Sequence, residues 1–205
     1  MSSSSFLTDP CVKLVADASV IINLNATARA TAIIKAVPNS FVVTENACTE
    51  LEMGARNGHH DYRHLTELID AGLVQRVRLG APDAAVYESL IDGSALRTLD
   101  DGEAATIAYA HQNACIPLID ERKARTLCAA SFPGLVVAST AELLMHESIA
   151  AAIGAQGQAD ALVNALTAAR MRVPLEHLER LMAVIGPDRA ALCASLPRAA
   201  RQKVS

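Results

Sequence analysis

Short apolar segments alternate with longer stretches of helical pattern along most of this chain. Four of them are largely apolar runs, at residues 12–16, 41–44, 115–119 and 135–138. Runs of this length are typical of strands buried on both faces of a sheet, and strands separated by helices pair in parallel. A fifth segment, residues 74–79, mixes apolar with charged side chains and is expected at a sheet edge. The pattern predicts an α/β fold with a central parallel sheet of four to five strands flanked by helices.

The expected helices divide the chain into three parts. In the α/β part they are expected at residues 19–36, 45–53, 60–71, 82–91, 101–113, 122–130 and 141–153, with Thr140 as the cap of the last one. After Gly154 only helices are expected, at residues 160–170, 175–185 and 188–196. We therefore predict a disordered Ser-rich leader at 1–11, an α/β domain at 12–153 and an all-helical C-terminal extension at 154–205.

Composition excludes several classes of protein. A hydrophobic content of 51% supports a buried core, whereas an aromatic content of 3% argues against platforms that stack nucleic-acid bases. The net charge of −4 excludes binding of nucleic acid by bulk positive charge. The five scattered cysteines read as small buried hydrophobes in a reducing compartment. Since neither a secretory signal nor a membrane span is recognisable, we expect a cytoplasmic protein.

Four carboxylates lie where an α/β fold would bring them together. Asp17 and Asp120 directly follow apolar strands, Glu50 lies on the helix after residues 41–44, and Glu103 lies at the start of an Ala-rich helix. Functional groups of parallel sheets gather at the carboxyl ends of the strands. Several carboxylates cannot all stay ionised there without a cation, so the pattern predicts a divalent-metal site.

Each carboxylate also has a simpler interpretation. Asp17 could cap the following helix together with Ser19. The acids at 100–103 occupy a first helical turn, where the helix dipole favours negative charge. Glu50 competes with Glu52, because the two lie on different faces of a helix and only one can face the site. The spacing from the preceding strand favours Glu50.

Four short segments, taken in order, resemble the motifs of the PIN domain. These are residues 15–19, 46–51, 99–104 and 118–125, which read VADAS, NACTEL, LDDGEA and LIDERKAR. PIN domains are metal-dependent nucleases that include the ribonuclease toxins of toxin–antitoxin pairs. The resemblance spans roughly residues 12–153, and the helices after Gly154 depart from the compact toxins.

The resemblance implies a function and a set of site residues. It implies hydrolysis of RNA with Mg²⁺ or Mn²⁺ held by Asp17, Glu50, Glu103 and Asp120, of which Asp17 and Asp120 would be direct ligands. Accessory roles would fall to Ser19, Asp101 and Glu121, and contacts to the RNA backbone to Arg122, Lys123 and Arg125. Helix capping by Ser19 and a solvated helix face for the three basic residues remain alternatives.

The main alternative to the nuclease is a non-catalytic binding module. A non-catalytic PIN-like module would use the apolar faces of its C-terminal helices to bind a partner protein or nucleic acid. An antitoxin is one expected partner, and a homodimer is expected from the Ala-rich helices. Zinc at His60 and His64 lacks further ligands, and a receiver domain would require paired acids after the first strand. The nuclease is the function that the sequence favours.

Overall fold

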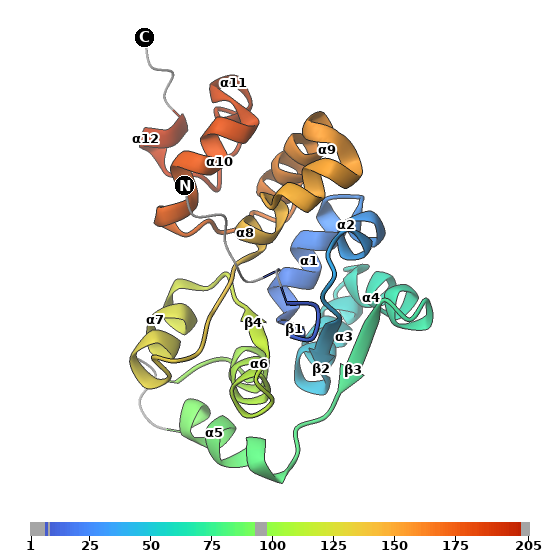
Figure 1. The fold of residues 1–205 in the computed structure, drawn as a ribbon, viewed down its shortest axis with the longest axis vertical. Helices are drawn as coiled ribbons and strands as arrows, with labels where there is room; N and C mark the ends of the chain where they lie inside the picture. Colours follow the sequence, from blue (N-terminus) through green and yellow to red (C-terminus); the bar gives the residue numbers. More distant parts are fainter. Residues whose placement is uncertain (1–6, 8, 93–97, 202–205) are drawn as a thin grey trace. The chain divides into compact units, whose positions relative to one another are not determined.

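The sheet has four parallel strands in the part of the chain that the structure describes. A computed structural model of the protein describes residues 7, 9–92 and 98–201 (Figure 1). The strands are β1 (Leu14–Ala16), β2 (Phe41–Thr44), β3 (Val74–Val77) and β4 (Ile116–Leu118), in the spatial order β3-β2-β1-β4. Every neighbouring pair is parallel, as the alternation of strands and helices predicts. The protein therefore has the expected α/β fold.

The register brings the carboxyl ends of the central strands to one edge of the sheet. Ala16, the last residue of β1, lies opposite Val43 of β2 on one side and Leu118 of β4 on the other. The residues that follow these strands leave the sheet at the same edge. This is the edge at which ligands bind in parallel sheets.

Two units divide the described chain. One contains the residues up to Ile21 and Pro38–Ala138, and the other contains Ile22–Val37 and the chain from Ser139 onward. The unit with the sheet contains helices α3 (Glu45–Arg56), α4 (Asp61–Asp70), α5 (Ala81–Ile91), α6 (Asp101–Gln112) and α7 (Arg122–Ser131). Helix α1 (Ala18–Ala26) begins in this unit and ends in the other.

Helix α6 is the central helix of the sheet unit. It packs against β1, β2 and β4, and it also contacts α3 and α5. Its apolar side chains join those of α5, α7 and the end of β4 in one cluster, which contains Leu90, Leu99, Ala104, Ile107, Ile119, Ala124 and Cys128. A second cluster joins Val15 and Val42 of the sheet to Ala110 and Cys115. The first turn of α6 is thus anchored by the core that follows it.

The other unit consists of helices. They are α2 (Ala30–Ala36), α8 (Thr140–Leu144), α9 (Glu147–Ala168), the short 3₁₀ helix η2 (Leu175–His177), α10 (Leu178–Ile185), α11 (Pro187–Ala190) and α12 (Arg198–Arg201). Helix α9 packs against α2, α8 and α10. The buried side chain of Gln158 on α9 donates hydrogen bonds to the carbonyl oxygens of Leu144 and His146, at 2.8 and 3.0 Å. The C-terminal part of the described chain is helical, as expected, although this unit also includes Ile22–Val37 and begins again at Ser139.

The predicted strand at residues 135–138 is wrong. In place of a strand, Ala138 forms an isolated parallel bridge with Leu118. The N–H of Leu135 donates instead to the carbonyl of Phe132, in the turn that follows α7. The chain therefore reaches the edge of β4 only at Ala138, and the sheet has four strands rather than five.

Several predicted helix boundaries are also wrong. The helix predicted at 19–36 is two helices, because Ala28 has a φ of +57° and ends α1. The helix predicted at 45–53 continues through Gly54 to Arg56. The helix predicted at 141–153 is divided into α8 and α9, and Ser139 rather than Thr140 caps α8. The predicted end at Ile153 agrees with a break inside α9, because Gly154, with a φ of +77°, is non-helical and two helices meet there at a kink.

The predicted leader at 1–11 lies mostly outside the described residues. Its described end is bound to the sheet unit, since the side chain of Asn39 donates to the carbonyl oxygens of Asp9 and Val12 at 2.8 and 2.7 Å. None of the described helices is both long enough and apolar enough to cross a membrane.

Ile107 tests the packing of α6 onto the sheet. Its side chain is fully buried in the larger cluster. We expect Ile107→Ala to lower the free energy of unfolding by about 2–5 kcal/mol, because the substitution leaves a cavity. Val136→Ala is the control, since Val136 is 58% exposed and should change stability by less than about 0.5 kcal/mol. Equal effects in denaturant unfolding would contradict this packing.

Candidate active site

Asp17 is a buried aspartate, and one of its two carboxylate oxygens accepts hydrogen bonds from Ser19. It follows β1 directly and is 4% exposed. Its Oδ2 accepts hydrogen bonds from the N–H and the Oγ of Ser19, at 3.3 and 2.8 Å, and so caps α1. Its Oδ1 is buried and has no hydrogen-bond partner among the described residues. Capping therefore accounts for Oδ2, while the buried Oδ1 has no partner in the described part of the chain and is the atom that a ligand would contact.

Burial raises the pKa of Asp17. Hydrogen bonds from the side chain of Ser19 and from the backbone of Ala18 and Ser19 oppose the shift, and the charge of Asp100 adds to it. An ionised carboxylate with an unpartnered oxygen is costly to bury without a compensating positive charge. The environment of Asp17 therefore favours either a proton or a cation at this position.

Glu50 contacts the first turn of α6. Its Oε1 accepts a hydrogen bond of 2.7 Å from the backbone N–H of Gly102. A Cβ atom at position 102 would lie 2.7–2.8 Å from the carboxylate of Glu50, which is closer than Cβ atoms approach other atoms. Glycine is thus required for this contact. Glu52, the competing residue, is exposed and forms an ion pair with Arg56.

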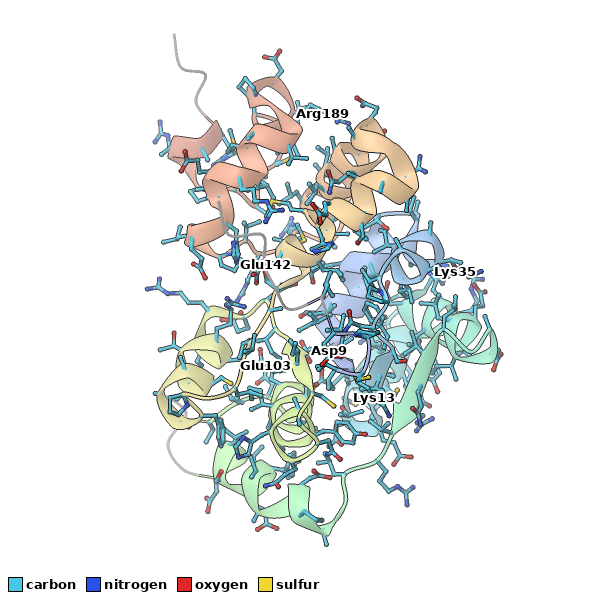
Figure 2. All side chains as sticks on the ribbon, in the orientation of Figure 1. Asp9, Lys13, Lys35, Glu103, Glu142 and Arg189 are labelled. Carbon is cyan, nitrogen blue, oxygen red and sulfur yellow. The ribbon has the colours of Figure 1, made fainter. Side chains whose placement is uncertain are left out.

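Glu103 follows Gly102 at the start of α6 and is 9% exposed (Figure 2). Burial raises its pKa to about 7, and the charges of Asp17, Asp100 and Glu50 contribute to the shift. A hydrogen bond with the backbone of Asp100 lowers the pKa in part. The side chain of Asp100 makes no capping hydrogen bond at this helix terminus, and the contact of Glu103 with the Asp100 backbone does not offset the negative charge around Glu103.

The same charges act on Glu50. Burial raises its pKa, and Asp17, Asp101 and Asp100 raise it further, whereas the Gly102 hydrogen bond lowers it. Asp17, Glu50 and Glu103 thus belong to one electrostatic cluster. Like charges that disfavour one another's ionised form are characteristic of sites that bind cations or move protons.

Asp120 lies at the same edge of the sheet. It comes two residues after β4 and is 6% exposed. Since Ala16 lies opposite Leu118 in adjacent parallel strands, Asp17 and Asp120 leave the sheet from strands about 4.8 Å apart. The fold therefore brings the four predicted acids to the carboxyl edge or to the helices beside it.

These acids do not form a ready-made metal cage. Within residues 7, 9–92 and 98–201, no three His, Cys, Asp or Glu side chains are arranged to hold a metal ion. Glu50 is turned toward Gly102, and one oxygen of Asp17 is turned toward Ser19. A cation bound to the cluster would require some of these side chains to rotate.

Asp101 is held from two sides. Its carboxylate accepts hydrogen bonds from Nδ2 of Asn46 at 3.0 and 3.1 Å, and from the hydroxyl of Tyr87. The bond to Asp101 raises the pKa of Tyr87 to about 12. Asn46 comes from α3 and Tyr87 from α5, so the first residue of α6 is connected to both neighbouring helices.

The remaining predicted residues surround β4 and α7. Ser19 lies in the first turn of α1 and donates its hydroxyl to Asp17, so Asp17 rather than Ser19 caps this helix. Glu121 is the residue before α7, while Arg122 and Lys123 are exposed on its first turn. Arg125 is half-buried, and its guanidinium donates to the carbonyl of Ile119 at 3.3 Å. Arg125 is thus connected to the backbone beside Asp120.

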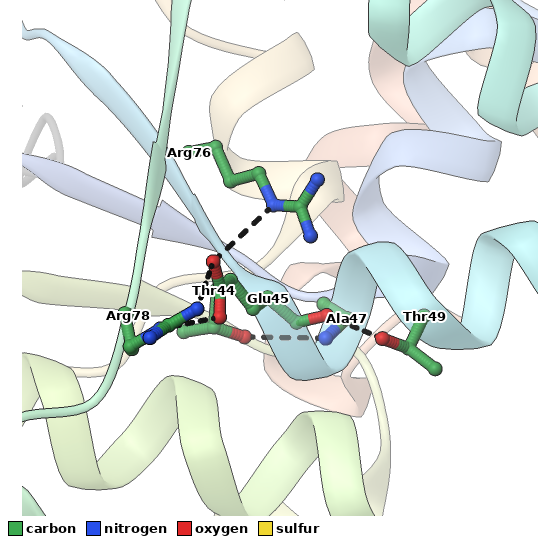
Figure 3. A network of polar contacts seen from close by, with 6 residues as sticks. All are labelled: Thr44, Glu45, Ala47, Thr49, Arg76 and Arg78. Carbon is green, nitrogen blue, oxygen red and sulfur yellow. Dashed lines mark hydrogen bonds and ion pairs between the residues drawn. The ribbon is translucent and has the colours of Figure 1, made fainter.

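A separate ionic network lies where α3 begins. The exposed guanidinium of Arg78 binds Glu45 at 2.8 Å, and Arg76 lies 3.8 Å from the same carboxylate (Figure 3). Arg78 and Arg76 lower the pKa of Glu45, in contrast to the raised values in the acidic cluster. Thr44 caps the same helix through the N–H of Ala47. The two arginines thus compensate the negative charge of Glu45 at the start of α3. Glu45 is therefore not one of the acids with a raised pKa.

A comparison with protein families identifies the fold. A family model described as a PIN domain matches residues 13–187, which is well over half of the chain. The chain belongs to the PIN-domain family. Among curated proteins and solved structures, no significant match was found.

The PIN-domain match extends further than the motifs. The four motif segments end at residue 125, whereas the match continues through α9 and α10 to residue 187. The helices after Gly154, as far as that residue, are thus part of the matched family pattern. PIN domains are generally nucleases, so the acidic cluster lies in a nuclease-type fold.

Sequence reasoning missed several residues of this site. Asp100 acts electrostatically on Asp17, Glu50 and Glu103, but in the sequence it reads as an ordinary helix-terminal acid. Asn46 carries one signal that could have been used, because it lies four residues before Glu50 and so on the same face of α3. Tyr87 carries no such signal, since it is distant from every motif in the sequence.

The raised pKa of Glu103 predicts a pH dependence of stability. Between about pH 4.5 and 7 the folded protein retains a proton that the unfolded chain has released. The free energy of unfolding should therefore fall as pH rises through this window. Across this pH window in EDTA, the free energy of unfolding of the wild type should fall by on the order of 2 kcal/mol relative to that of Glu103→Gln. A stability difference that is independent of pH would contradict the raised pKa.

Gly102 provides a test of the contact with Glu50. We expect Gly102→Ala to be less stable than a helical glycine-to-alanine control by about 1 kcal/mol, because the added Cβ displaces the end of the Glu50 side chain and breaks its hydrogen bond with the Gly102 N–H. The control is Gly54→Ala, since Gly54 also lies inside a helix and a Cβ there has only ordinary contacts with His59, at 3.9 and 4.0 Å. Urea unfolding of both variants gives the comparison. A Gly102→Ala variant as stable as the control would show that the close approach does not exist.

Proposed function

We propose that this PIN-domain protein is an endoribonuclease that depends on Mg²⁺ or Mn²⁺ and hydrolyses phosphodiester bonds of RNA. The observation that carries the proposal is the unpartnered Oδ1 of buried Asp17, whose charge raises the pKa of both Glu50 and Glu103. A divalent cation would satisfy both the open oxygen and the excess negative charge.

The chemistry of the donors fits such a cation. The four acids Asp17, Glu50, Glu103 and Asp120 offer only carboxylate oxygens, which are the ligands that Mg²⁺ and Mn²⁺ prefer. These residues would hold the ion after the side-chain rotations described above. When bound, it would supply Lewis-acid chemistry, which activates water and stabilises charge on the leaving oxygen.

The protein's own groups would position the reactants. Asp17 would keep its cap on α1 through Oδ2 and Glu50 would keep the N–H of Gly102 through Oε1, and each would turn its second oxygen to the ion. Glu103, with a pKa of about 7, can hold or release a proton at neutral pH. Arg122 and Lys123 are exposed directly after Asp120 and would bind the RNA backbone.

We also propose a cytoplasmic protein that binds protein partners. All five cysteines are free thiols, which is consistent with a reducing compartment. Leu175 and Leu192 in the helical unit are 70% and 72% exposed, and we propose that they take part in a contact with a second copy or with an antitoxin. Light scattering should give the mass of a dimer at working concentration. The mass of a monomer would argue against self-association.

Asp17→Asn tests the nuclease proposal. The substitution keeps an oxygen to cap α1 but removes the charge, so the fold should persist. We expect RNA cleavage to fall by at least about 100-fold, since charge stabilisation in the transition state is lost. Labelled structured and single-stranded RNAs should be incubated with Mg²⁺, Mn²⁺ or EDTA. Cleavage that survives in Asp17→Asn or in EDTA would refute the proposal.

Glu50 and Glu52 form a matched pair for a second test. Both are glutamates on α3, but Glu50 faces α6 whereas Glu52 is exposed. Glu50→Gln should reduce the rate of RNA cleavage at saturating Mn²⁺ strongly, and Glu52→Gln should leave it within about twofold of the wild type. Similar rates for the two variants would exclude Glu50 from the site. A folded protein that binds Mn²⁺ but cleaves no RNA would favour the non-catalytic partner-binding alternative.

A further inference from the structure

Helix α3 presents two polar side chains to the first turn of α6. Asn46 and Glu50 are four residues apart and therefore lie on one face of the helix. The amide of Asn46 donates to the carboxylate of Asp101, and the carboxylate of Glu50 accepts from the N–H of Gly102. Two adjacent residues of α6 are thus bound by one face of α3.

A third contact comes from α5. The hydroxyl of Tyr87 donates to Oδ1 of Asp101, the oxygen that also receives one of the Asn46 bonds. An ionised carboxylate can only accept hydrogen bonds, so Asn46 and Tyr87 are the matching donors. Asp101 is therefore bound on two sides, and its carboxylate is directed toward α3 and α5.

We propose that Asn46, Tyr87 and Asp101 are positioning residues of the nuclease site, which fix the first turn of α6 so that Gly102 holds Glu50 and Glu103 faces the metal. We call these three residues the α6 clamp. The proposal rests on the proposed function and assigns Asp101 a different role from that of a fifth metal ligand. Glu103 acts on substrate or metal, and the clamp acts through it.

Repulsion between neighbouring carboxylates explains why such a clamp is needed. The charges of Asp17, Asp100 and Glu50 disfavour ionised Glu103. Repulsion of this kind would push the first turn of α6 away from the sheet edge unless polar contacts held it. Gly102 has no side chain that could add a contact of its own, because the Glu50 carboxylate occupies that space. The hydrogen bonds of Asp101 are the adjacent side-chain contacts that resist the repulsion.

The test uses the full-length protein and two readouts. The first is the amide signal of Gly102 in protein labelled with ¹⁵N-glycine, which contains ten glycines. The second is the dissociation constant of Mn²⁺. Asn46→Ala and Tyr87→Phe should each shift the Gly102 signal, accelerate its hydrogen exchange, and weaken Mn²⁺ binding by about 10-fold. Thr49→Ala is the control, because Thr49 lies on α3 but bonds only to the carbonyl of Glu45.

A charge-conserving exchange separates positioning from ligation. In the double variant Asn46→Asp with Asp101→Asn, the carboxylate and the amide change places and can still bond to each other. If Asp101 is a clamp residue, the exchange should restore both readouts toward the wild type relative to Asn46→Ala. If Asp101 is a metal ligand, the exchange should weaken Mn²⁺ binding as much as Asp101→Ala does, and the proposal would be overturned.

Failure of the clamp and failure of the nuclease give different results. A Gly102 signal unchanged in both Asn46→Ala and Tyr87→Phe, or changed equally in Thr49→Ala, would overturn the clamp whatever the activity. A wild type that binds no Mn²⁺ would instead refute the proposed function, while the Gly102 signal would still decide whether the clamp fixes α6.

Discussion

Negative charge buried at the carboxyl edge of the sheet is the constraint on which the rest of the site depends. Asp17 is almost fully buried, and only one of its oxygens has a hydrogen-bond partner among the described residues. The charge of Asp17 raises the pKa of both Glu50 and Glu103, and the charge of Glu50 adds to the shift of Glu103. Such an arrangement costs folding free energy, and proteins retain it where the charges have a function.

The surrounding structure holds these charges in place. Helix α6 is anchored through its apolar side chains to the sheet, and its first turn is bound by α3 and α5. The acid at the start of α3 is neutralised by Arg76 and Arg78, so it adds no charge to the cluster. Arginine side chains thus lower the pKa of Glu45, whereas neighbouring acids raise the pKa of Glu50 and Glu103.

Much of the fold could be predicted from the sequence, because its signals are local. Buried strands are short apolar runs, and β1, β2 and β4 were recognisable in this way, as was the polar edge strand β3. The errors came from tertiary effects. Residues 135–138 are apolar enough for a strand, but Leu135 is held in a turn. The break after α1 depends on a left-handed Ala28, a conformation for which alanine carries no signal.

The candidate site was predictable in part. The positions of Asp17 and Asp120 follow from the rule that parallel strands end at one edge, whereas the close approach of Gly102 to Glu50 required the structure. The choice between Glu50 and Glu52 required the structure, because it depends on the position of α6. The contacts of Asp101 with Asn46 and Tyr87 join residues far apart in the sequence, so no local pattern could reveal them.

The central claim is that the buried acids bind a divalent cation. Calorimetric titration of the metal-free protein with Mn²⁺ at pH 7, in two buffers of different ionisation enthalpy, tests it most directly. Cation binding requires ionised carboxylates, and Glu103 has a pKa of about 7. We expect the wild type to bind one or two ions and to release protons to the buffer. We expect Asp17→Asn to lose that binding. Absence of binding at millimolar Mn²⁺, or equal binding by Asp17→Asn, would contradict it.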